Sequence, residues 1–383
     1  MKMPWPDVPV GEFAASIVRR EEVNPEKYYR QVGVRLWGNG AYERETIKGS
    51  NTKYKSLFRI STNDIIINKI WARNGSVAVI TPELDGTYGS GEFPTFSPNL
   101  NKLDPLWFRW ITQWRPFWSR CEEKSRGATG KNRIKPQRFL EITIPLPPLS
   151  EQQRIVKKIE QVASRVKKAK FLSEKIEEDQ TALLLRRAGE ICKEARFLKM
   201  SEVAPIIRRH VDIKPDKWYP ELGIRSFGRG TFHKVAIKGS DVGKKPLFHI
   251  EVGDLLISQV FAWEGAIAVV QPENKGRFGS HRFITCLPDP NLATAEFLCY
   301  YFLTDSGLKD LRKASTGAAG RNKPLGFTRL PNIKVPIPPI EIQKNFSQLV
   351  NYIKNVKQIH RQVVIGLGHV IPALLDQAFG GEL

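Results

Sequence analysis

The feature that most constrains the fold of this chain is an internal repeat with a constant offset. The segment Gly33–Gly40, GVRLWGNG, aligns with Gly223–Gly230, GIRSFGRG, at an offset of 190 residues (223 − 33 = 190). The same offset aligns Gly127–Asn132 with Gly317–Asn322. Because unrelated segments do not keep one register over such a distance, the chain is a tandem duplication. Its fold must therefore contain two copies of one domain.

A proline-rich segment ends each copy of the repeat. Ile144–Gln152, IPLPPLSEQ, returns as Val335–Gln343, VPIPPIEIQ, and a long helical pattern follows each segment. Proline lacks an N–H group and clashes with the preceding turn of a helix. Each segment is therefore predicted to be a stiff, extended hinge that leads into a helix.

Apolar residues follow each hinge at alternating gaps of three and four, which is the spacing of a coiled-coil seam. Ser173, Gln180 and His360 interrupt this seam and are candidates for setting its register. Because either helix alone would expose an apolar stripe, we expect the two helices to pair with each other. The simplest pairing is antiparallel, with one copy of the domain at each end. The predicted seam includes Ile155, Ile159, Val162 and Val166 in the first helix and Phe346, Leu349, Ile353 and Val356 in the second.

Each copy is predicted to contain β-strands followed by a helix. Aromatic-rich stretches at 103–118 and 294–308 predict a helix that packs on the sheet. Trp107, Trp110 and Trp114 recur at helical spacing, which favours core packing over stacking on an extruded base. The strands are predicted from β-branched runs bounded by turn residues, at 61–70, 76–80, 253–260 and 266–270.

These patterns predict an α+β fold with two tandem-repeat mixed α/β domains, separated by two long helices that form an antiparallel coiled coil. The predicted segments are a first domain at 1–148, a first helix at 149–195, a second domain at 196–338 and a second helix at 339–383.

The charge of the chain points to a polyanionic partner. Lys and Arg number 60 against 39 Asp and Glu, a formal net charge of +21, which favours nucleic acid first and an anionic membrane second. No unbroken apolar run reaches the roughly 18 residues of a membrane span, and the first residues lack an apolar signal core. We therefore expect a cytoplasmic protein that is not embedded in a membrane. The scattered cysteines predict reduced, inert thiols, with neither zinc nor disulfides.

The hinge and the helix start at 145–156, PLPPLSEQQRIV, resemble the conserved regions of the specificity subunits of type I restriction–modification systems. The final Ala378–Leu383, AFGGEL, and the half-length repeat are also similar to that family, so the resemblance covers essentially the whole chain. The second hinge departs from the pattern, because its Glu341 is displaced by one position relative to Glu151. The departure leaves the contacts of the second helix with partners open.

The resemblance implies a subunit without catalysis of its own and without a bound cofactor. Each domain would read a few base pairs of double-stranded DNA, so that the target is bipartite and asymmetric. The two helices would dock two modification subunits, which methylate adenine with S-adenosylmethionine, and a restriction subunit would add ATP- and Mg-dependent cleavage. Helix length would then set the unread gap. Besides the seam residues above, the residues expected to dock subunits or to support the coiled coil are Pro147, Pro148, Gln152, Pro338, Pro339 and Gln343.

Candidate DNA contacts are basic and amide side chains on loops that leave the predicted sheets, because such groups bond base edges and phosphates. The glycine-rich repeat loops are favoured, since glycine lets the backbone approach a phosphate. A solvated basic turn remains the alternative for these loops, and a structural salt bridge remains the alternative for Arg35 and Arg225. The candidates are Arg35, Lys69, Arg73, Asn74, Lys131, Asn132 and Arg133 in the first copy, and Arg225, Gln259, Trp263, Ser280, His281, Arg282, Arg321, Asn322 and Lys323 in the second.

Other function classes find less support in the sequence. Asp104 with Glu122 and Glu123 could suggest a nuclease carboxylate set, but a surface charge cluster is favoured. The repeated G-x-G lacks the rest of a dinucleotide fingerprint and is expected to be a tight turn. Amino-methyltransferase motifs and a phosphate-binding loop are absent from the sequence. A non-catalytic coiled-coil scaffold that binds nucleic acid without sequence preference remains the alternative function.

Overall fold

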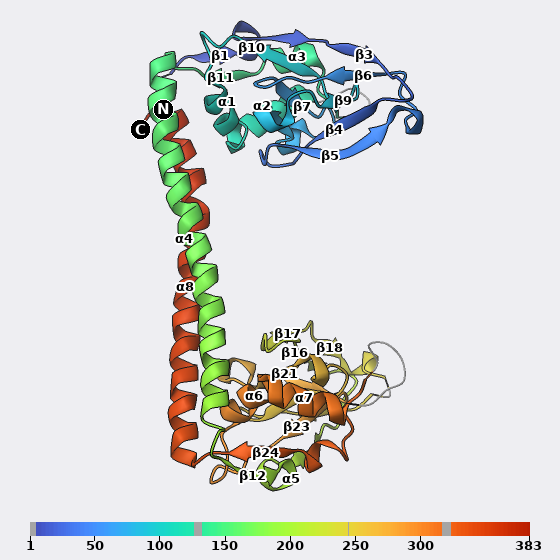
Figure 1. Cartoon of the computed structure of the whole chain (residues 1–383), viewed down its shortest axis with the longest axis vertical. Helices are drawn as coiled ribbons and strands as arrows, with labels where there is room; N and C mark the ends of the chain where they lie inside the picture. The colour runs from blue at the N-terminus through green and yellow to red at the C-terminus, as the bar shows by residue number, and fades with distance from the viewer. Residues whose placement is uncertain (1–4, 126–131, 244, 316–322) are drawn as a thin grey trace. The chain divides into compact units, whose positions relative to one another are not determined.

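The computed structural model describes residues 5–125, 132–243, 245–315 and 323–383. The chain separates into two compact units (Figure 1). Unit 1 comprises Met1–Phe171 together with Gln362–Leu383, and unit 2 comprises Leu172–Arg361. This division falls inside the two long helices, whereas the boundaries predicted from the sequence fall at the two hinges and after residue 195. Each unit therefore combines one copy of the repeat with parts of both helices.

Unit 1 contains a sheet of order β2-β10-β7-β8, a second sheet of order β3-β6-β9-β4-β5 and the ribbon β1-β11. The first sheet carries the core beneath the helices, and its central strand β7 and edge strand β8 are short, apolar and buried. The strands are β1 Asp7–Pro9, β2 Ala14–Ile17, β3 Arg20–Glu22, β4 Tyr28–Val34, β5 Ala41–Lys48, β6 Ser56–Arg59, β7 Ile65–Ile67, β8 Val77–Val79, β9 Tyr88–Gly89, β10 Thr95–Pro98 and β11 Thr143–Pro145. Short 3-10 turns are η1 Val10–Glu12, η2 Gly49–Asn51, η3 Ala72–Asn74 and η4 Pro82–Leu84.

Unit 2 repeats this plan with a broken second sheet. Its core sheet has the order β13-β23-β20-β21, and the ribbon β12-β24 corresponds to β1-β11. The pieces β14-β19-β22, β15-β18 and β16-β17 replace the second sheet of unit 1. The strands are β12 Arg196–Lys199, β13 Ile206–Ile207, β14 Arg209–His210, β15 Trp218–Tyr219, β16 Leu222–Ile224, β17 Thr231–His233, β18 Ile237–Lys238, β19 Leu247–His249, β20 Leu255–Ser258, β21 Ile267–Val269, β22 Phe278–Ser280, β23 Phe283–Cys286 and β24 Lys334–Ile337. The short helical elements are α5 Met200–Val203, η5 Gly239–Asp241, η6 Ala262–Glu264, η7 Pro272–Asn274 and η8 Leu330–Asn332.

The same buried ion pair stabilises the start of the core hairpin in both units. Asp64 and Asp254 are almost fully buried, and each accepts a bidentate pair of bonds from an arginine, Arg19 or Arg209. Asp64 also accepts the backbone N–H of Ser61 at 2.9 Å. Because this turn occupies 61–64, strand β7 is shorter than the predicted strand at 61–70. The equivalent ion pairs, 190 residues apart, confirm the tandem repeat.

The aromatic-rich stretches form two helices in each unit, so the single helices predicted at 103–118 and 294–308 are wrong in this respect. Unit 2 shows the cause, because Thr304 leaves the helical conformation and its hydroxyl caps the next helix by accepting the N–H of Gly307 at 3.3 Å. In unit 1, Pro116 sits at the second position of the new helix, where its missing N–H is not needed. The helices are α1 Pro105–Ile111, α2 Arg115–Ser125 and α3 Pro136–Leu140 in unit 1, and α6 Ala295–Leu303 and α7 Asp305–Ala314 in unit 2.

The long helices α4, Leu149–Glu190, and α8, Ile340–Gly380, run antiparallel within unit 2. Lys357 donates to the Thr181 hydroxyl at 2.8 Å, and Arg361 lies 3.6 Å from Glu177. Four residues toward the C-terminus of α8 thus correspond to four residues toward the N-terminus of α4. The two helices are therefore antiparallel here, as the sequence predicts. In unit 1 the end of α8 lies beside the start of α4 (Figure 1).

One correction concerns the membrane. By length and composition α8 is apolar enough to cross a membrane, with a mean hydropathy of 1.5 over its most apolar stretch. The sequence-based exclusion was too broad, because it considered unbroken apolar runs rather than average hydropathy. A single such helix is weak evidence for a span, and its two ends lie in the cores of the units.

Phe379 tests the contribution of α8 to unit 1. Its fully buried ring lies 4.9 Å from the ring of Trp107 and 5.2 Å from that of Trp114. Phe379→Ala should lower the free energy of unfolding of unit 1 by about 3–5 kcal/mol, because it leaves a cavity. Urea denaturation followed by tryptophan fluorescence measures this, with the exposed Gln377→Ala as the control. Equal midpoints for the two variants would contradict the assignment.

Candidate DNA interface

In unit 1 the connection between β7 and β8, residues 68–76, is the point where candidate contacts meet. Lys69 donates its backbone N–H to the Glu92 carbonyl at 3.1 Å, and its Nζ to the Gly91 carbonyl at 2.5 Å. The carbonyl of Lys69 accepts the N–H of Ile134 at 2.9 Å. Arg133 Nη1 lies 3.3 Å from Glu92 Oε1. Segments that are distant in the sequence are therefore held on one side of this connection.

The turn of the β4–β5 hairpin docks on the other end of the same connection. Trp37 donates its N–H to the carbonyl of Asn74 at 2.7 Å, and Gly38 donates its N–H to the carbonyl of Gly75 at 2.9 Å. Gly38 and Gly40 have positive φ angles, so the repeated G-x-G is a tight turn, as predicted from the sequence. Arg73 and Asn74 thus lie beside the hairpin turn.

Unit 2 builds the same arrangement from different side chains around the connection between β20 and β21, residues 259–266. Gln259 donates its N–H to the Arg282 carbonyl and accepts the N–H of Leu325, both at 2.8 Å. Lys323 Nζ lies 5.7 Å from the centre of the Trp263 ring. The candidates that sequence reasoning placed on three separate loops of unit 2 therefore meet at one connection.

Charge distinguishes unit 2 from unit 1 at this place. Burial lowers the pKa of the His281 imidazole, and the positive charges of Arg282, Lys245 and Arg208 lower it further, although Glu221 raises it. The depressed pKa means that this imidazole is neutral at neutral pH and lies in a basic surrounding. The equivalent residue of unit 1 is Gly91, and its neighbour Glu92 is acidic. The two units therefore present different charges from equivalent positions.

Arg35 and Arg225 each contact an aromatic ring, a role beyond the two alternatives from the sequence, which were a DNA contact and a structural salt bridge. The guanidinium of Arg35 lies 4.4 Å from the ring centre of Tyr42, and that of Arg225 lies 4.8 Å from the ring centre of Phe232. Each guanidinium also donates to a carbonyl across its own hairpin, at 3.4 Å and 2.5 Å. Both arginines remain exposed, so they brace the hairpin and still present positive charge to solvent.

Several candidates add little to this geometry. Asn132 is half-buried at the edge of the described chain, and the hydroxyl of the half-buried Ser280 accepts the N–H of Arg282 at 3.3 Å. Lys131, Arg321 and Asn322 lie outside the described residues.

The hinge residues divide into a buried and an exposed set. Gln152 and Gln343 are fully buried, and each Nε2 donates to two carbonyls at 2.8–2.9 Å while each Oε1 accepts one N–H, at 2.9 Å and 3.1 Å. Their side chains tie each long helix to the domain and leave no surface for a partner. Pro147 and Pro338 are buried, and Pro148 and Pro339 are exposed. Of the seam residues, Ile155, Ile159, Val166, Phe346 and Ile353 are buried, and Val162, Leu349 and Val356 are partly buried.

Sequence reasoning missed four exposed aromatic side chains around the two connections. Trp37 and Phe227 occupy equivalent hairpin turns, and Trp71 and Phe261 occupy equivalent positions before η3 and η6. The tryptophans that drew notice, Trp107, Trp110 and Trp114, are instead buried in the core, as favoured. The alignment of the two repeats contained the missed signal, because both of these positions carry an aromatic residue in each repeat.

The alternative chemistries receive no geometric support. The Asp104 carboxylate caps α1 by accepting the N–H of Leu106 at 2.8 Å, while Glu122 and Glu123 are exposed on α2. Among the residues that the structure describes, there is no group of three or more His, Cys, Asp or Glu that could hold a metal ion. The cysteines are free, and burial raises the pKa of the Cys192 thiol to about 11.

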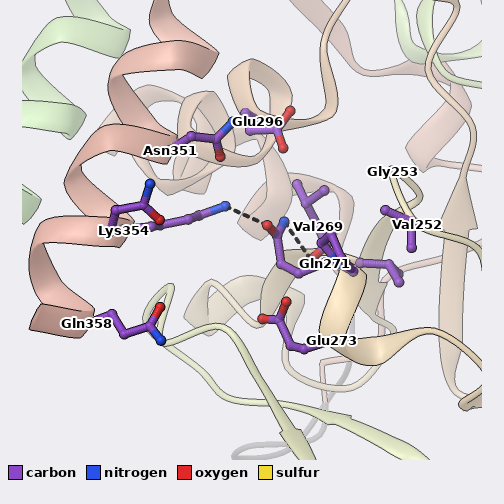
Figure 2. A pocket seen from close by; sticks show the side chains of 12 residues that line it. Val252, Gly253, Val269, Gln271, Glu273, Glu296, Asn351, Lys354 and Gln358 are labelled. Carbon is purple, nitrogen blue, oxygen red and sulfur yellow. Dashed lines mark hydrogen bonds between the residues drawn. The ribbon is translucent and has the colours of Figure 1, made fainter. Parts of the chain in front are cut away.

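A cavity of about 480 Å³ lies in unit 2 between α8 and the turn that follows β21 (Figure 2). Lys354 reaches across it from α8 and donates to Gln271 Oε1 at 3.0 Å, and Glu273 and Glu296 line its wall. Because its central lysine and glutamine already bond each other, this cavity resembles a solvated groove more than a small-molecule site.

Comparison with known proteins decides the family. The family described as the type I restriction modification DNA specificity domain matches residues 4–178 and again 193–364. The chain belongs to this family. Two matches account for the duplication, because each contains one copy of the repeat with its hinge and the first part of its long helix.

Curated relatives from Methanocaldococcus jannaschii share part of their length with the chain. The putative type I restriction enzyme MjaX specificity subunit is 24% identical over 188 residues, 46% of this chain and 44% of that protein. The type I restriction enzyme MjaVIII specificity subunit is 22% identical over 261 residues, 61% of this chain and 60% of that protein. The chain thus aligns with less than two thirds of the length of each relative.

Solved structures show the shared fold over the whole chain. The HsdS subunit from Thermoanaerobacter tengcongensis has a TM-score of 0.62 at 21% identity, with coverage of 100% of this chain and 99% of that chain. A chain from the structure described as "Structural basis underlying complex assembly and conformational transition of the type I R-M system" has a TM-score of 0.71 at 20% identity, with complete coverage of both chains.

Gln343 tests whether the hinge glutamines are structural. Gln343→Leu removes three hydrogen bonds and leaves the N–H of Thr294 and two carbonyls without these partners in a partly buried site. Each unpaired group should cost about 1–3 kcal/mol, so chemical denaturation should show unit 2 strongly destabilised. Lys344→Ala, at the next and exposed position, is the control and should change the unfolding midpoint little. A stable Gln343→Leu variant would indicate that the glutamine serves a partner instead.

Proposed function

We propose that this chain is the sequence-specific DNA-recognition subunit of a type I restriction–modification enzyme and performs no catalysis itself. The observation that carries the proposal is the match of both halves of the chain to a DNA specificity domain. The excess of positive charge, +21, supports a DNA partner. We infer that the two connections, 68–76 and 259–266, face the DNA.

The differences between the units support a bipartite, asymmetric target. Equivalent positions carry Arg73 and Asn74 in unit 1 but Trp263 and Glu264 in unit 2. Gly91 and Glu92 in unit 1 likewise correspond to His281 and Arg282 in unit 2. Since base edges are distinguished by their pattern of donors and acceptors, two such sites would read two different short sequences.

Partners and cofactors follow from the same proposal. We infer that α4 and α8 dock two modification subunits, which carry S-adenosylmethionine, and that a restriction subunit carries ATP and Mg²⁺. We expect this chain to bind no cofactor, and we place the assembly in the cytoplasm, where it meets DNA. A scaffold that binds nucleic acid without sequence preference is the less favoured alternative, because both halves match a specificity domain.

Methylation mapping tests the proposed function. The gene for the chain is deleted, and genomic adenine methylation is compared with that of the parent and of a strain complemented with the wild-type chain. We expect a methylated, split motif that disappears on deletion and returns on complementation. An unchanged methylation pattern, together with salt-sensitive binding of the purified chain to any duplex, would favour the scaffold.

Arg282 tests the proposed interface of unit 2. Its backbone carbonyl accepts the N–H of Gln259 while its side chain is exposed, and we expect that side chain to contact a phosphate. Arg282→Ala should weaken binding to all duplexes alike and lower the slope of log affinity against log salt by about 0.9, the value for one phosphate contact. Lys334→Ala, an exposed cation on β24 in the same unit, is the control and should leave the slope unchanged. An unchanged slope for Arg282→Ala would place the DNA elsewhere.

A further inference from the structure

Two bulky aromatic residues hold a backbone conformation that side chains of their kind rarely adopt. Trp37 has φ = 61° and Phe227 has φ = 62°, and they occupy equivalent positions of the two repeats. Among the described residues, the remaining non-glycine residue with positive φ is Asn63, which tolerates this region well. Strained residues persist where the surroundings over-determine them, and they concentrate at functional sites.

The same pair of hydrogen bonds imposes this conformation in both units. Phe227 donates its N–H to the Glu264 carbonyl at 2.8 Å, and Gly228 donates its N–H to the Gly265 carbonyl at 3.0 Å. Trp37 and Gly38 make the matching bonds in unit 1. Because these contacts use backbone groups, they do not explain why the strained position carries an aromatic ring.

Packing explains these rings only in part. The Trp37 side chain is 51% exposed and that of Phe227 is 68% exposed. Trp37 contacts Trp118, with ring centres 5.4 Å apart. For Phe227, the guanidinium of Arg229 lies 5.7 Å from the ring centre. A glycine would adopt this conformation without strain and would expose less apolar surface. Both repeats nevertheless place a large, rigid aromatic ring there.

The surroundings of the rings suit a nucleic acid. Trp71 and Phe261, exposed in the adjacent connections, add a second aromatic side chain in each unit. Arg73 lies 5.9 Å from the ring of Trp71, and Arg229 lies beside Phe227. Exposed aromatic rings next to cations are the combination that stacks on bases while the cations hold phosphates.

We propose that Trp37 and Phe227 are wedges that enter the base stack of the DNA, one in each half of the target, and stack on a base that they separate from its neighbour. This rests on the proposed function and adds a DNA distortion to it. The strained turn would hold each ring rigidly outward, so that little conformational entropy is lost on insertion.

The test uses the full chain co-purified with its modification subunit. The probe is a duplex with the split motif found by methylation mapping, with 2-aminopurine placed at each position of both halves in turn. At saturating protein, the wild type should raise the fluorescence at one position in each half. Phe227→Gly should abolish the increase in one half, and Trp37→Gly should abolish it in the other. Each should lower the affinity by about 10- to 100-fold, the value of one base–aromatic stack.

Control variants separate stacking from folding. Phe227→Tyr keeps an aromatic ring and should retain the fluorescence increase. Phe197→Ala removes an equally exposed ring, on β12 and in ordinary backbone conformation, and should retain it too. Because glycine relieves the strain, Phe227→Gly should unfold at the wild-type temperature or above it.

Four results would overturn the wedge. Phe227→Gly could leave the fluorescence and the affinity unchanged while the complex still prefers the split motif, in which case the proposed function stands. A large loss of thermal stability would show that the ring serves folding, and loss of co-purification would show that it docks a protein. A wild-type complex without preference for the motif would instead remove the proposed function, and the wedge with it.

Discussion

The core of each unit is completed by a helix segment that is distant in the sequence, and the rest of the structure depends on this packing. Ala378 and Phe379 from the end of α8 lie in the core of unit 1, and Leu184 and Ala188 from the end of α4 lie in the core of unit 2. Neither copy of the repeat can therefore bury its full apolar surface with its own residues. The folding of each unit is coupled to the formation of both long helices.

The hinges convert this packing into a fixed geometry. Each hinge proline run continues from an edge ribbon, β11 or β24, and passes directly into a helix. One turn later, the buried glutamine of each hinge donates a hydrogen bond to a carbonyl of the hinge. Its side-chain oxygen accepts the backbone N–H of the residue that precedes α1 or α6. The short core strands β7 and β20 then present their connections at one edge of a well-packed sheet. A rigid scaffold that positions variable loops is the usual arrangement for recognition, and here equivalent scaffolds carry connections with different side chains.

The sequence predicts the parts of this structure that repeat or have a period. The offset of 190 residues, the extended hinges and the antiparallel helices follow from register, from proline geometry and from apolar spacing. The burial of Trp107, Trp110 and Trp114 follows from helical spacing in the same way.

Other parts depend on contacts that no local pattern contains. Strands of three or four residues carry too little signal to predict their order in the sheets, and the break between α6 and α7 depends on the cap at Thr304. Candidate residues such as Lys69 and Gln259 are chosen correctly as loop residues, but their convergence with 90–92 and 280–282 depends on sheet pairing. The left-handed conformation of Trp37 and Phe227 cannot be read from aromatic residues, which normally avoid it.

In the proposed function, equivalent connections in the two units face one DNA molecule. Hydrogen–deuterium exchange of the complex with its modification subunit, with and without a duplex that carries the split motif, tests this most directly. We expect slower exchange in both units at equivalent places, 35–40 with 68–76 and 225–230 with 259–266. Protection of backbone amides in one unit alone, or only in the lysine-rich exposed part of α4, would contradict a DNA interface formed by both connections.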